Sequence, residues 1–262
     1  MSSISLNVLL HVARSGLQAQ QTKMDTLAHN MSNMNTTGFK HVRAEFQELL
    51  DVQLADATAG SNRESGRAAG TRLSATQRLF EQGAVEMSDY EWDMAIEGDG
   101  FFQVRMPDGT FGYTRDGSFR MDGQGRLTTA DGYLLVPEFT LPPDAEDVMV
   151  NSDGTVMVRR RGEVDPTVLA TLTLSRFVSA EGLDAAGENL FRETVASGAP
   201  VQSAPGTPGV GNLIGHALER SNVDLSQEMV DLISTQRAYT IMIHLLQTSD
   251  EMLGMANQLR SG

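Results

Sequence analysis

The two ends of the chain share an apolar repeat of about 3.5 residues, a spacing that suits a packed helix. Near the N-terminus, alternating steps of four and three residues meet apolar side chains from Leu6 to Met34, with Gln20 as the one polar exception. A repeat held this long favours a coiled-coil-like helix with one narrow seam, because an ordinary amphipathic helix shows a wider apolar stripe. We predict a helix over residues 1–38. Its seam residues are Leu6, Leu10, Leu17, Met24, Leu27 and Met31.

The C-terminal end repeats this pattern and predicts a second helix over residues 223–262, paired with the first. Asp224 can cap its first turn, Gln227 stands at the capping-box position, and Glu228 suits the positive end of a helix. Its seam residues are Leu225, Met229, Leu232, Tyr239, Ile243, Leu246 and Leu253. A further apolar set, which extends the buried surface beyond one neighbour, comprises Ile233, Ile241, Met242, Leu245, Met252 and Met255.

Between the helices, residues 81–205 have the pattern of a β domain. Six Asp-Gly pairs occur, and Asp-Gly between short alternating runs is a strong hairpin signal because a primed turn needs positive φ at its central residues. Eleven of the fifteen aromatic residues lie between Tyr90 and Phe191, where they can fill a small core. Alternation is clear around Val156 and Val158. It is clearest along 168–175, which places on one face Val168, Ala170, Leu172 and Leu174.

Segments rich in small residues join these parts. Residues 39–80 predict an extended linker or hairpin, with a flexible or partner-ordered stretch at 51–75, and residues 206–222 predict a return linker. The predicted fold class is therefore α+β. Discontinuous, coiled-coil-like N- and C-terminal helices flank an inserted, mostly antiparallel β domain.

Charge and cysteine content exclude several functions. The 262 residues carry a net charge of -14, which argues against nucleic acid as a partner. Residues 81–205 alone hold 22 acids and 9 bases, net -13, so the acidity belongs to the β domain. The absence of cysteine suits an oxidising space or passage through a pore in the unfolded state. The N-terminus lacks the basic region of a cleaved signal peptide, and no apolar run is long enough for a membrane-spanning helix.

No residue pattern assigns a catalytic, cofactor-binding or metal site. The five histidines lack ligand spacing, and no nucleophile elbow or phosphate loop occurs. The carboxylates at Glu97, Asp99, Asp108 and Asp116 could in principle serve a glycosidase, but aspartates that bond their own turn backbone explain most of them. The basic run at 159–161 fits a solvated strand end that offsets nearby carboxylates.

The run HNMSNMNTTGFK at 29–40 ends the N-terminal seam, and Gly38 can take the left-handed conformation that terminates a helix. This run resembles the signature NNxANxxTxGFK of the bacterial flagellar rod and hook axial proteins. The matching residues are Asn30, Asn33, Thr37, Gly38, Phe39 and Lys40. Four further stretches resemble that family in the same order: DMAIEGDGFFQV at 93–104, YTRDGSF at 113–119, GENLFRETVASGAP at 187–200 and SNVDLSQEMVDLISTQRAY at 221–239.

The resemblance is strongest to the subunits of the distal rod, which carry an added stretch at the position after Leu50. The stretch here is shorter and richer in Gly and Ala, and Met242 stands where the family often has Asn. The resemblance implies a non-enzymatic structural subunit of the hollow helical drive shaft that crosses the periplasm, transmits torque from motor to hook and forms part of the export channel. The terminal helices would line its inner layer and the β domain its exterior.

The same resemblance implies partners but no cofactor. The partners are further copies of this chain, the proximal rod proteins, the hook protein, the surrounding basal-body rings and the flagellar type III export apparatus, which would export the chain without a cleaved signal. Two alternatives stay open from the sequence. One is a proximal rod or hook subunit of the same family, and the other is a secreted enzyme or adhesin that uses the acidic β domain.

Overall fold

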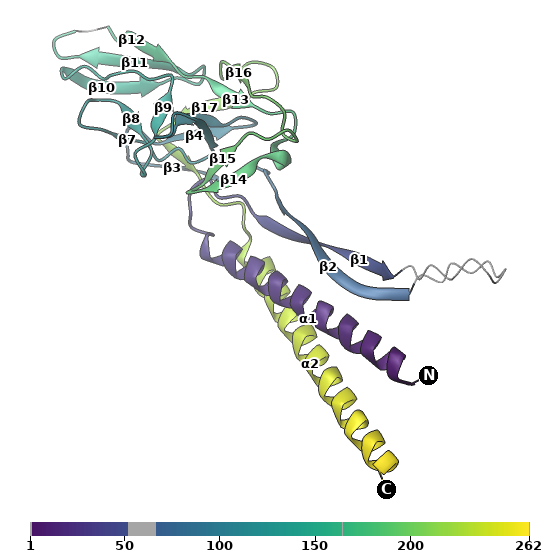
Figure 1. Cartoon of the computed structure of the whole chain (residues 1–262). Coiled ribbons are helices and arrows are strands. Elements are labelled where there is room, and N and C mark those ends of the chain that lie inside the picture. Colours follow the sequence, from purple (N-terminus) through teal and green to yellow (C-terminus); the bar gives the residue numbers. More distant parts are fainter. Residues whose placement is uncertain (1, 52–66, 164, 262) are drawn as a thin grey trace, which may run out of the picture. The chain divides into compact units, whose positions relative to one another are not determined.

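The computed structural model describes residues 2–51, 67–163 and 165–261. The chain divides into two compact units, each discontinuous in sequence. Unit 1 comprises residues 1–32, 42–78 and 224–262, and unit 2 comprises residues 33–41 and 79–223. Two helices at the ends of the chain and a large antiparallel β region between them confirm the α+β class (Figure 1). The coiled-coil character of the helices stays a prediction.

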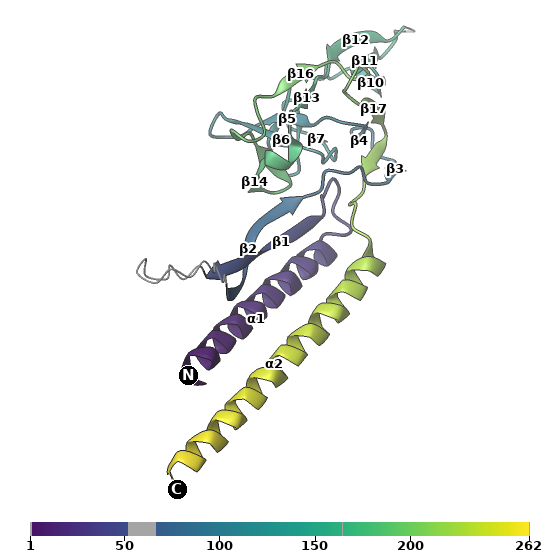
Figure 2. The same cartoon turned by 90° about the vertical axis from the view of Figure 1, so that its right-hand side faces the viewer.

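Unit 1 consists of two long helices and one β-hairpin. The helices α1 (Ser2–Ser32) and α2 (Leu225–Ser261) lie side by side and run antiparallel, so both chain termini are at the same end of the pair (Figure 2). Strand β1 (Val42–Asp51) pairs antiparallel with β2 (Arg67–Arg78), and the hairpin packs on α1. The backbone N–H of Thr71 donates to Ser15 Oγ at 3.2 Å. Neither helix is long and apolar enough to span a membrane, as far as its described residues show.

The boundaries of unit 1 differ from the predicted ones in two places. Helix α1 ends at Ser32 and not at residue 38, because a turn begins at Asn33, whose carbonyl accepts the N–H of Thr36 at 3.1 Å. Of the two alternatives predicted for residues 39–80, the hairpin agrees with β1 and β2. The flexible or partner-ordered stretch predicted at 51–75 is wrong for residues 67–75, which belong to β2. Pairing with β1 satisfies the backbone groups there, so the strand needs no apolar alternation. The rest of that predicted linker, 52–66, lies outside the described residues.

The start of α2 agrees with its predicted cap in part. The Asp224 carboxylate accepts the backbone N–H groups of Ser226 at 2.8 Å and Gln227 at 3.3 Å, which confirms the cap. The capping-box role of Gln227 is wrong, because its side chain donates to Asp231 at 3.1 Å, one turn further along the helix. For the Gln227 side chain, the i,i+4 contact with Asp231 on the helix surface replaces the backbone contact of a capping box.

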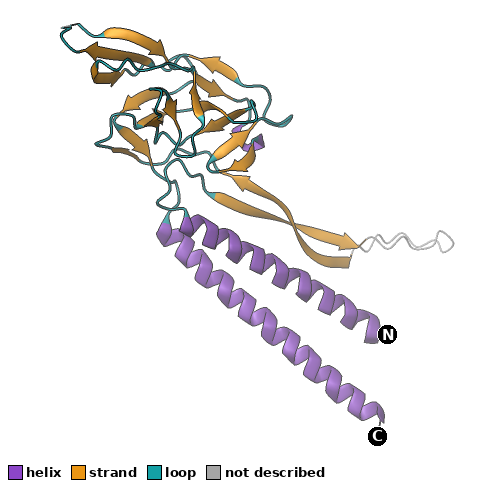
Figure 3. Cartoon of the chain, turned by 60° about the vertical axis from the view of Figure 1, so that its left-hand side comes forward, coloured by secondary structure: helices purple, strands orange, loops and turns teal. Residues whose placement is uncertain are grey.

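Unit 2 is built from sixteen short strands in several small sheets (Figure 3). The largest sheet has seven strands in the order β14-β15-β6-β5-β9-β8-β7, and a three-stranded sheet has the order β10-β11-β12. The remaining strands form the pairs β13-β16, β17-β4 and β18-β3. The bounds are β3 Val85–Met87, β4 Met94–Glu97, β5 Phe102–Arg105, β6 Phe111–Thr114, β7 Arg120–Met121, β8 Leu127–Thr128, β9 Leu134–Val136, β10 Ala145–Val150, β11 Thr155–Arg160, β12 Thr167–Thr171, β13 Leu174–Arg176, β14 Asp184–Gly187, β15 Leu190–Arg192, β16 Val201–Ser203, β17 Asn212–Gly215 and β18 Ala217–Glu219, with a 3-10 turn at Ala180–Gly182.

The segment 206–222 is not the predicted return linker, because it contains β17 and β18. These strands pair with β4 and β3 of the region before them, so the returning chain completes the β unit. The composition of residues 206–222 gave no sign of these two strands. Leu213 and Ala217 are fully buried, but each lies in a strand of only a few residues among glycines and prolines.

Two apolar clusters fill unit 2. One spans the sheets and includes Met94, Ile96 and Val104, none of which is exposed. The other is aromatic, with Phe101, Tyr113, Phe177 and Phe191 at its centre. Rings in this cluster meet edge to face, as at 4.8 Å between the centroids of Tyr113 and Phe177. That geometry favours the quadrupoles of neighbouring rings. The two clusters together contain nine of the eleven aromatic residues between Tyr90 and Phe191.

The Asp-Gly pairs form hairpins at four of their six positions, between β5 and β6, β7 and β8, β8 and β9, and β10 and β11. The pairs at Asp99 and Asp116 do not join paired strands. The expected primed geometry is wrong, because among the described non-glycine residues only Glu188, Asn189 and His216 have positive φ. The primed turn of this unit is instead Glu188-Asn189, between β14 and β15.

The alternation predicted along 168–175 is interrupted. Leu172 and Leu174 are buried as expected, but Val168 is 62% exposed and Leu169 packs on the core. A register shift opposite Met157 places one extra residue in β12 and exchanges the faces of the strand, which is the usual effect of a β-bulge. Val156 and Val158 are buried, as predicted.

Candidate functional site

The predicted seam residues in unit 1 are mostly half-buried. Leu27 is the one described apolar residue of this unit that is fully buried, and Leu225 and Met229 are exposed. The side chains of Leu6, Leu10 and Leu253 lie outside the described part of the structure. The half-buried members are Leu17, Met24, Met31, Leu232, Tyr239, Ile243 and Leu246. A single chain therefore covers its own seam only in part.

The most buried contact between the helices is polar. The Asn30 side chain, which has no exposed surface, accepts the Val42 N–H at 3.0 Å and donates to the Val42 carbonyl at 2.9 Å. The same amide donates to Glu228 Oε2 of α2 at 3.4 Å. Asn30 thus fixes the last turn of α1 to the first residue of β1 and to the first turn of α2. Because a buried amide needs all these partners, the contact sets the register of the elements it joins.

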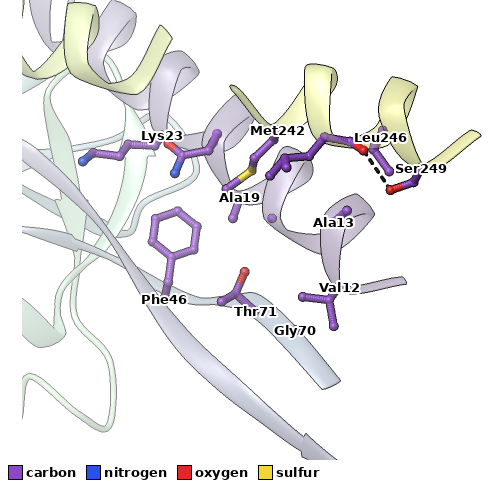
Figure 4. Close-up of a pocket in the computed structure, with 13 residues that line it drawn as sticks. Val12, Ala13, Ala19, Lys23, Phe46, Gly70, Thr71, Met242, Leu246 and Ser249 are labelled. Atoms are coloured by element: carbon purple, nitrogen blue, oxygen red, sulfur yellow. Dashed lines mark hydrogen bonds between the residues drawn. The ribbon is translucent and has the colours of Figure 1, made fainter. Parts of the chain in front are cut away.

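A groove of about 550 Å³ runs within unit 1 between α1, α2 and β2 (Figure 4). Small residues of α1 form its floor, and a Cβ atom added at Gly16 would lie only 3.2 Å from the Met242 sulfur. Phe46 of β1 and Lys23 of α1 stand at one end. The apolar lining comprises Val12, Ala13, Ala19, Phe46, Met242, Leu245 and Leu246.

The second apolar set of α2 is exposed. Ile241 and Leu245, for example, are 60% and 61% exposed. Two members of the set also line the groove, namely the half-buried Met242 and the exposed Leu245 at its edge. We call the outward residues the α2 stripe; its members are Val230, Ile233, Ile241, Leu245, Met252 and Met255. At about 100° per residue, these positions fall on one side of the helix. No described residue of the chain covers them, so α2 carries an apolar face that one chain leaves in water.

In unit 2, Gly38 holds the left-handed conformation predicted for it, with φ of 66°. Its N–H donates to the Glu219 carbonyl at 2.8 Å. A Cβ atom added here would lie 2.6 Å from the backbone nitrogen of Asp116, so the position excludes side chains by crowding as well as by φ. Thr37 beside it donates its hydroxyl to Asp116 at 2.8 Å. Phe39 follows as a buried side chain, and Asn33 accepts the Thr36 hydroxyl at 3.2 Å.

The last signature residue, Lys40, ends in a buried ion pair with Glu219 at 2.6 Å, and neither side chain has exposed surface. Lys40 Nζ also donates to the Glu81 carbonyl at 2.7 Å, and Glu219 Oε1 accepts the Gly83 N–H at 2.9 Å. Burial lowers the pKa of Lys40 from its ordinary value of 10.5, while the Glu219 carboxylate opposes that shift. Such a pair holds three chain segments together, because either charge alone would be costly inside the protein.

Arg115 adds a second cation to this pair. Its Nη1 lies 3.5 Å from Glu219 Oε2, its Nη2 donates to the Gly98 carbonyl at 2.8 Å, and its guanidinium lies 5.3 Å from the centroid of the Phe101 ring. Burial lowers the pKa of Arg115, and the Glu219 charge again opposes the shift. The signature run singled out Lys40, and Arg115 lies in the stretch 113–119 that also resembles the family, but neither stretch contains Glu219. Glu219 follows Ala217 in the short strand β18, which the sequence did not reveal, so no sequence signal marked it.

The turn carboxylates are structural in the positions described. Asp108, Asp122 and Asp153 each accept a backbone N–H two residues ahead, at 2.8 to 2.9 Å. Hydrogen bonds to the charged form lower the pKa of all three. A catalytic acid needs the opposite shift. In the basic run at 159–161, Arg159 pairs with Asp147 at 3.0 Å and Arg161 with Glu146 at 3.3 Å, as predicted. The described residues contain no cluster suited to a metal ion.

Family models match three regions of the chain. Residues 10–40 match the flagella basal body rod protein, residues 95–158 the D1 domain of the flagellar hook protein FlgE/F/G, and residues 215–259 the C-terminal region of the flagellar basal body rod FlgEFG proteins. The first and third regions contain the paired helices and the second lies within the β unit. The class is therefore that of structural subunits of the flagellar rod and hook.

Relatives that match nearly the whole chain show more closely which proteins of this class it resembles. The flagellar basal-body rod protein FlgG of Borreliella burgdorferi is 43% identical over 96% of this chain and 98% of its own length. FlgG of Caulobacter vibrioides is 39% identical over 96% and 99%, and FlgG of Bacillus subtilis 34% over 93% and 96%. The chain belongs to the flagellar FlgE/F/G family and groups with its FlgG rod proteins. It is a structural subunit of the distal rod in the flagellar basal body, and the resemblance inferred from the signature run is confirmed.

Proposed function

We propose that copies of this chain polymerise through unit 1 into the hollow helical rod that carries torque from the motor to the hook and encloses part of the export channel. The α2 stripe of one copy packs into the groove of another, and the seam completed in this way is coiled-coil-like. The seam residues are those named above, from Leu6 to Met31 in α1 and from Leu225 to Leu253 in α2. The observation that carries the proposal is the pairing, on one unit, of an uncovered apolar stripe with an apolar groove.

The stripe and the groove share only Leu245, at the edge of the groove, and are otherwise different surfaces, which favours a helical polymer. A contact between two different patches is heterologous, so each added copy presents a free patch again and the assembly grows unless it closes into a ring. Each fully buried Leu, Ile or Met side chain contributes about 1.5 to 3 kcal/mol. Several such residues per contact offset the entropy lost when a copy joins the rod and leave enough to resist torsion.

The remaining partners follow from the place of such a rod. Its ends meet the proximal rod proteins and the hook protein, and its flank passes through the basal-body rings. The helices form the inner layer and the acidic β unit faces outward. A chain without cysteine is suited to the flagellar type III apparatus, which exports subunits unfolded.

Lysine labelling tests the central contact, because the chain has only two lysines. Lys40 is fully buried, whereas Lys23 is exposed at the end of the groove. A small amine-reactive reagent should modify Lys23 rapidly in the monomer and slowly in the polymer, as read by peptide mass mapping. A Val195→Lys variant is the control, since Val195 is fully exposed on unit 2 and its lysine shows that the reagent reaches the polymer. Equal labelling of Lys23 in both states would contradict a filled groove.

A further inference from the structure

One charged residue interrupts the middle of the α2 stripe. Arg237 lies one helical turn from Ile233 and one turn from Ile241, so it falls among the exposed apolar side chains. It is exposed itself and makes no ion pair with any residue that the structure describes. The nearest acidic residues in the sequence of α2 are Asp231 and Asp250, about 9 and 20 Å away along the helix axis. Its own helix therefore offers Arg237 no i,i+3 or i,i+4 partner.

The proposed contact would take Arg237 out of water together with the stripe. The aliphatic stem of an arginine can pack on apolar neighbours, but a buried guanidinium without a counter-charge opposes association. A carboxylate is the partner that fits its planar fork of donors. A groove that receives the stripe should therefore present a carboxylate beside its apolar lining.

The groove has such a carboxylate on its hairpin wall. Glu48 of β1 stands directly opposite Thr71 of β2, and Thr71 lines the groove. Phe46, two residues before Glu48 on the same strand, also lines it. Directly opposite residues share a face of a ribbon, as do alternate residues of a strand, so Glu48 is on the groove side of the hairpin. It is exposed and forms no ion pair within the described part of the chain.

Other charged residues of the hairpin are paired or face away. Glu45 is held by Arg43 at 2.8 Å. Arg72 stands opposite Gln47, and both therefore lie on the face of the ribbon that Glu48 does not share. Glu48 is thus the carboxylate of the described hairpin that is available to an incoming cation.

Lys23 is the one cation in the groove lining, and it is away from Glu48. It stands at the end of the groove (Figure 4), whereas Thr71, opposite Glu48, donates its N–H to Ser15 Oγ. Lys23 and Ser15 are about 12 Å apart along α1. The same distance along α2 from Arg237 reaches Leu245 in one direction and the apolar Met229 in the other. An α2 helix with Arg237 at Glu48 therefore brings no second cation to Lys23.

We infer that Arg237 of one copy pairs with Glu48 of a second copy when the α2 stripe enters the groove. The inference rests on the proposed assembly through unit 1 and names the contact that fixes its register. Apolar contacts are non-directional, so a stripe alone could slide along a groove by a helical turn. A charge that must be paired on burial allows one alignment. Each copy has both residues, so the pair recurs at every contact of the polymer.

Exchange of the two charges tests the pair. Arg237→Glu and Glu48→Arg each bring like charges together and should raise the critical concentration for polymerisation, measured by sedimentation, by about ten-fold or more. The double variant has opposite charges in exchanged positions. It should polymerise within about three-fold of the unmodified chain, because the two substitutions are coupled. Circular dichroism of each unassembled variant checks that the helices are retained.

Asp25→Arg is the matched control. Asp25 is another exposed carboxylate of unit 1, but it is two residues from the groove residue Lys23 and therefore about 200° away around α1. Combined with Arg237→Glu, it should leave polymerisation as weak as in Arg237→Glu alone.

The outcomes separate this inference from the proposed function. Normal polymerisation of either single variant, or a double variant no better than the single ones, overturns the pair and leaves assembly through unit 1 intact. Rescue by Asp25→Arg as strong as that by Glu48→Arg also overturns it, because net charge and not position would then decide assembly. If the unmodified chain itself forms no filaments, self-assembly is contradicted and the inference falls with it.

Discussion

The two units of this chain bury their apolar side chains to very different extents. In unit 2, Met94, Ile96 and Val104 have no exposed surface. In unit 1, by contrast, Leu27 alone is buried among the described apolar residues, and Ile241 and Leu245 are more than half exposed. A side chain that stays in water in the monomer contributes little to the fold of that monomer. Unit 2 is therefore stabilised by its own core, whereas most apolar side chains of unit 1 are left partly or largely exposed.

The buried residues differ in kind as well as in number. Besides Leu27, the helices of unit 1 bury polar side chains, namely Asn30, Glu228 and Thr235. Polar contacts in a helix interface cost stability but fix which residues face each other. Unit 1 therefore specifies the alignment of its helices within one chain, and under the proposed assembly most of its hydrophobic free energy would be gained when copies meet.

The largest expected effect comes from a charge in the seam of unit 1. Leu232→Asp should abolish polymerisation, because an unpaired carboxylate would have to be buried at every contact. The fold of unit 2 should persist, as measured by the fluorescence of Trp92, which lies in that unit. Leu17→Asp should behave in the same way.

Val195→Asp is the control for both variants, since it places the same charge on a fully exposed residue of unit 2. It should polymerise normally in electron micrographs. Normal filaments from Leu232→Asp would remove the distinction between the two units.

A smaller but still large effect is expected in the buried ion pair of unit 2. Glu219→Gln leaves Lys40 and Arg115 without a counter-charge and should lower the free energy of unfolding by about 3 to 5 kcal/mol. Denaturant unfolding followed by Trp92 fluorescence measures it. Glu86→Gln removes an exposed partner of Arg220 at 3.0 Å and should cost less than about 1 kcal/mol. An equal loss of unfolding free energy in the two variants would show that burial does not determine how much these ion pairs stabilise the fold.

The turn glycine of the signature run gives the next effect. Gly38→Val should destabilise unit 2 by at least about 1 to 3 kcal/mol from backbone strain and reduce assembly. Crowding adds to this cost. Gly109→Val is matched, because Gly109 also has positive φ but an added Cβ atom meets nothing within 4 Å. A cost at Gly38 no greater than at Gly109 would contradict the close approach of Asp116.

The smallest expected effect is the dependence of the Asp122 turn on acidic pH. The Asp122 carboxylate accepts the backbone N–H groups of Gln124 at 2.8 Å and Arg126 at 2.9 Å, and these bonds lower its pKa below the ordinary 3.8. The pKa of the Asp122 carboxyl is lower in the folded chain than in the unfolded chain. The carboxylate therefore contributes its full stabilisation of the turn when the pH is above the unfolded pKa. This stabilisation is lost as the pH falls through the folded pKa. A carboxyl titration by NMR should give a midpoint below 3.8. A midpoint above it would contradict the turn geometry.

Local features of the fold could be predicted from the sequence, because their causes are local. The Asp224 cap, the left-handed Gly38 and the hairpins at four Asp-Gly pairs each depend on a few neighbouring residues. A hairpin within residues 39–80 was one of two alternatives from the sequence, but the extent of β2 over 67–75 could not be predicted, since a paired ribbon needs no alternation. The Glu219 partner of Lys40 could not either, because the two residues are 179 positions apart and meet only through the fold.

The uncovered state of the α2 stripe was also beyond the sequence. Apolar spacing predicted that Ile233, Ile241 and Leu245 face neighbours, but the same spacing would fit neighbours within the chain. In the structure, α1 packs on a different side of α2, and the hairpin packs on α1. Neither of them covers the α2 stripe, so this face stays exposed in a single chain.

Amide hydrogen exchange of the unassembled chain and of the polymer, followed by peptide mass spectrometry, tests the central claim most directly. In the unassembled chain, peptides from α1 and α2 should exchange quickly and the core strands of unit 2 slowly, since exchange reports the local free energy of opening. In the polymer, the helical peptides should become protected while the core of unit 2 changes little. Helices as protected in the free chain as the core of unit 2, with no gain on assembly, would contradict the account.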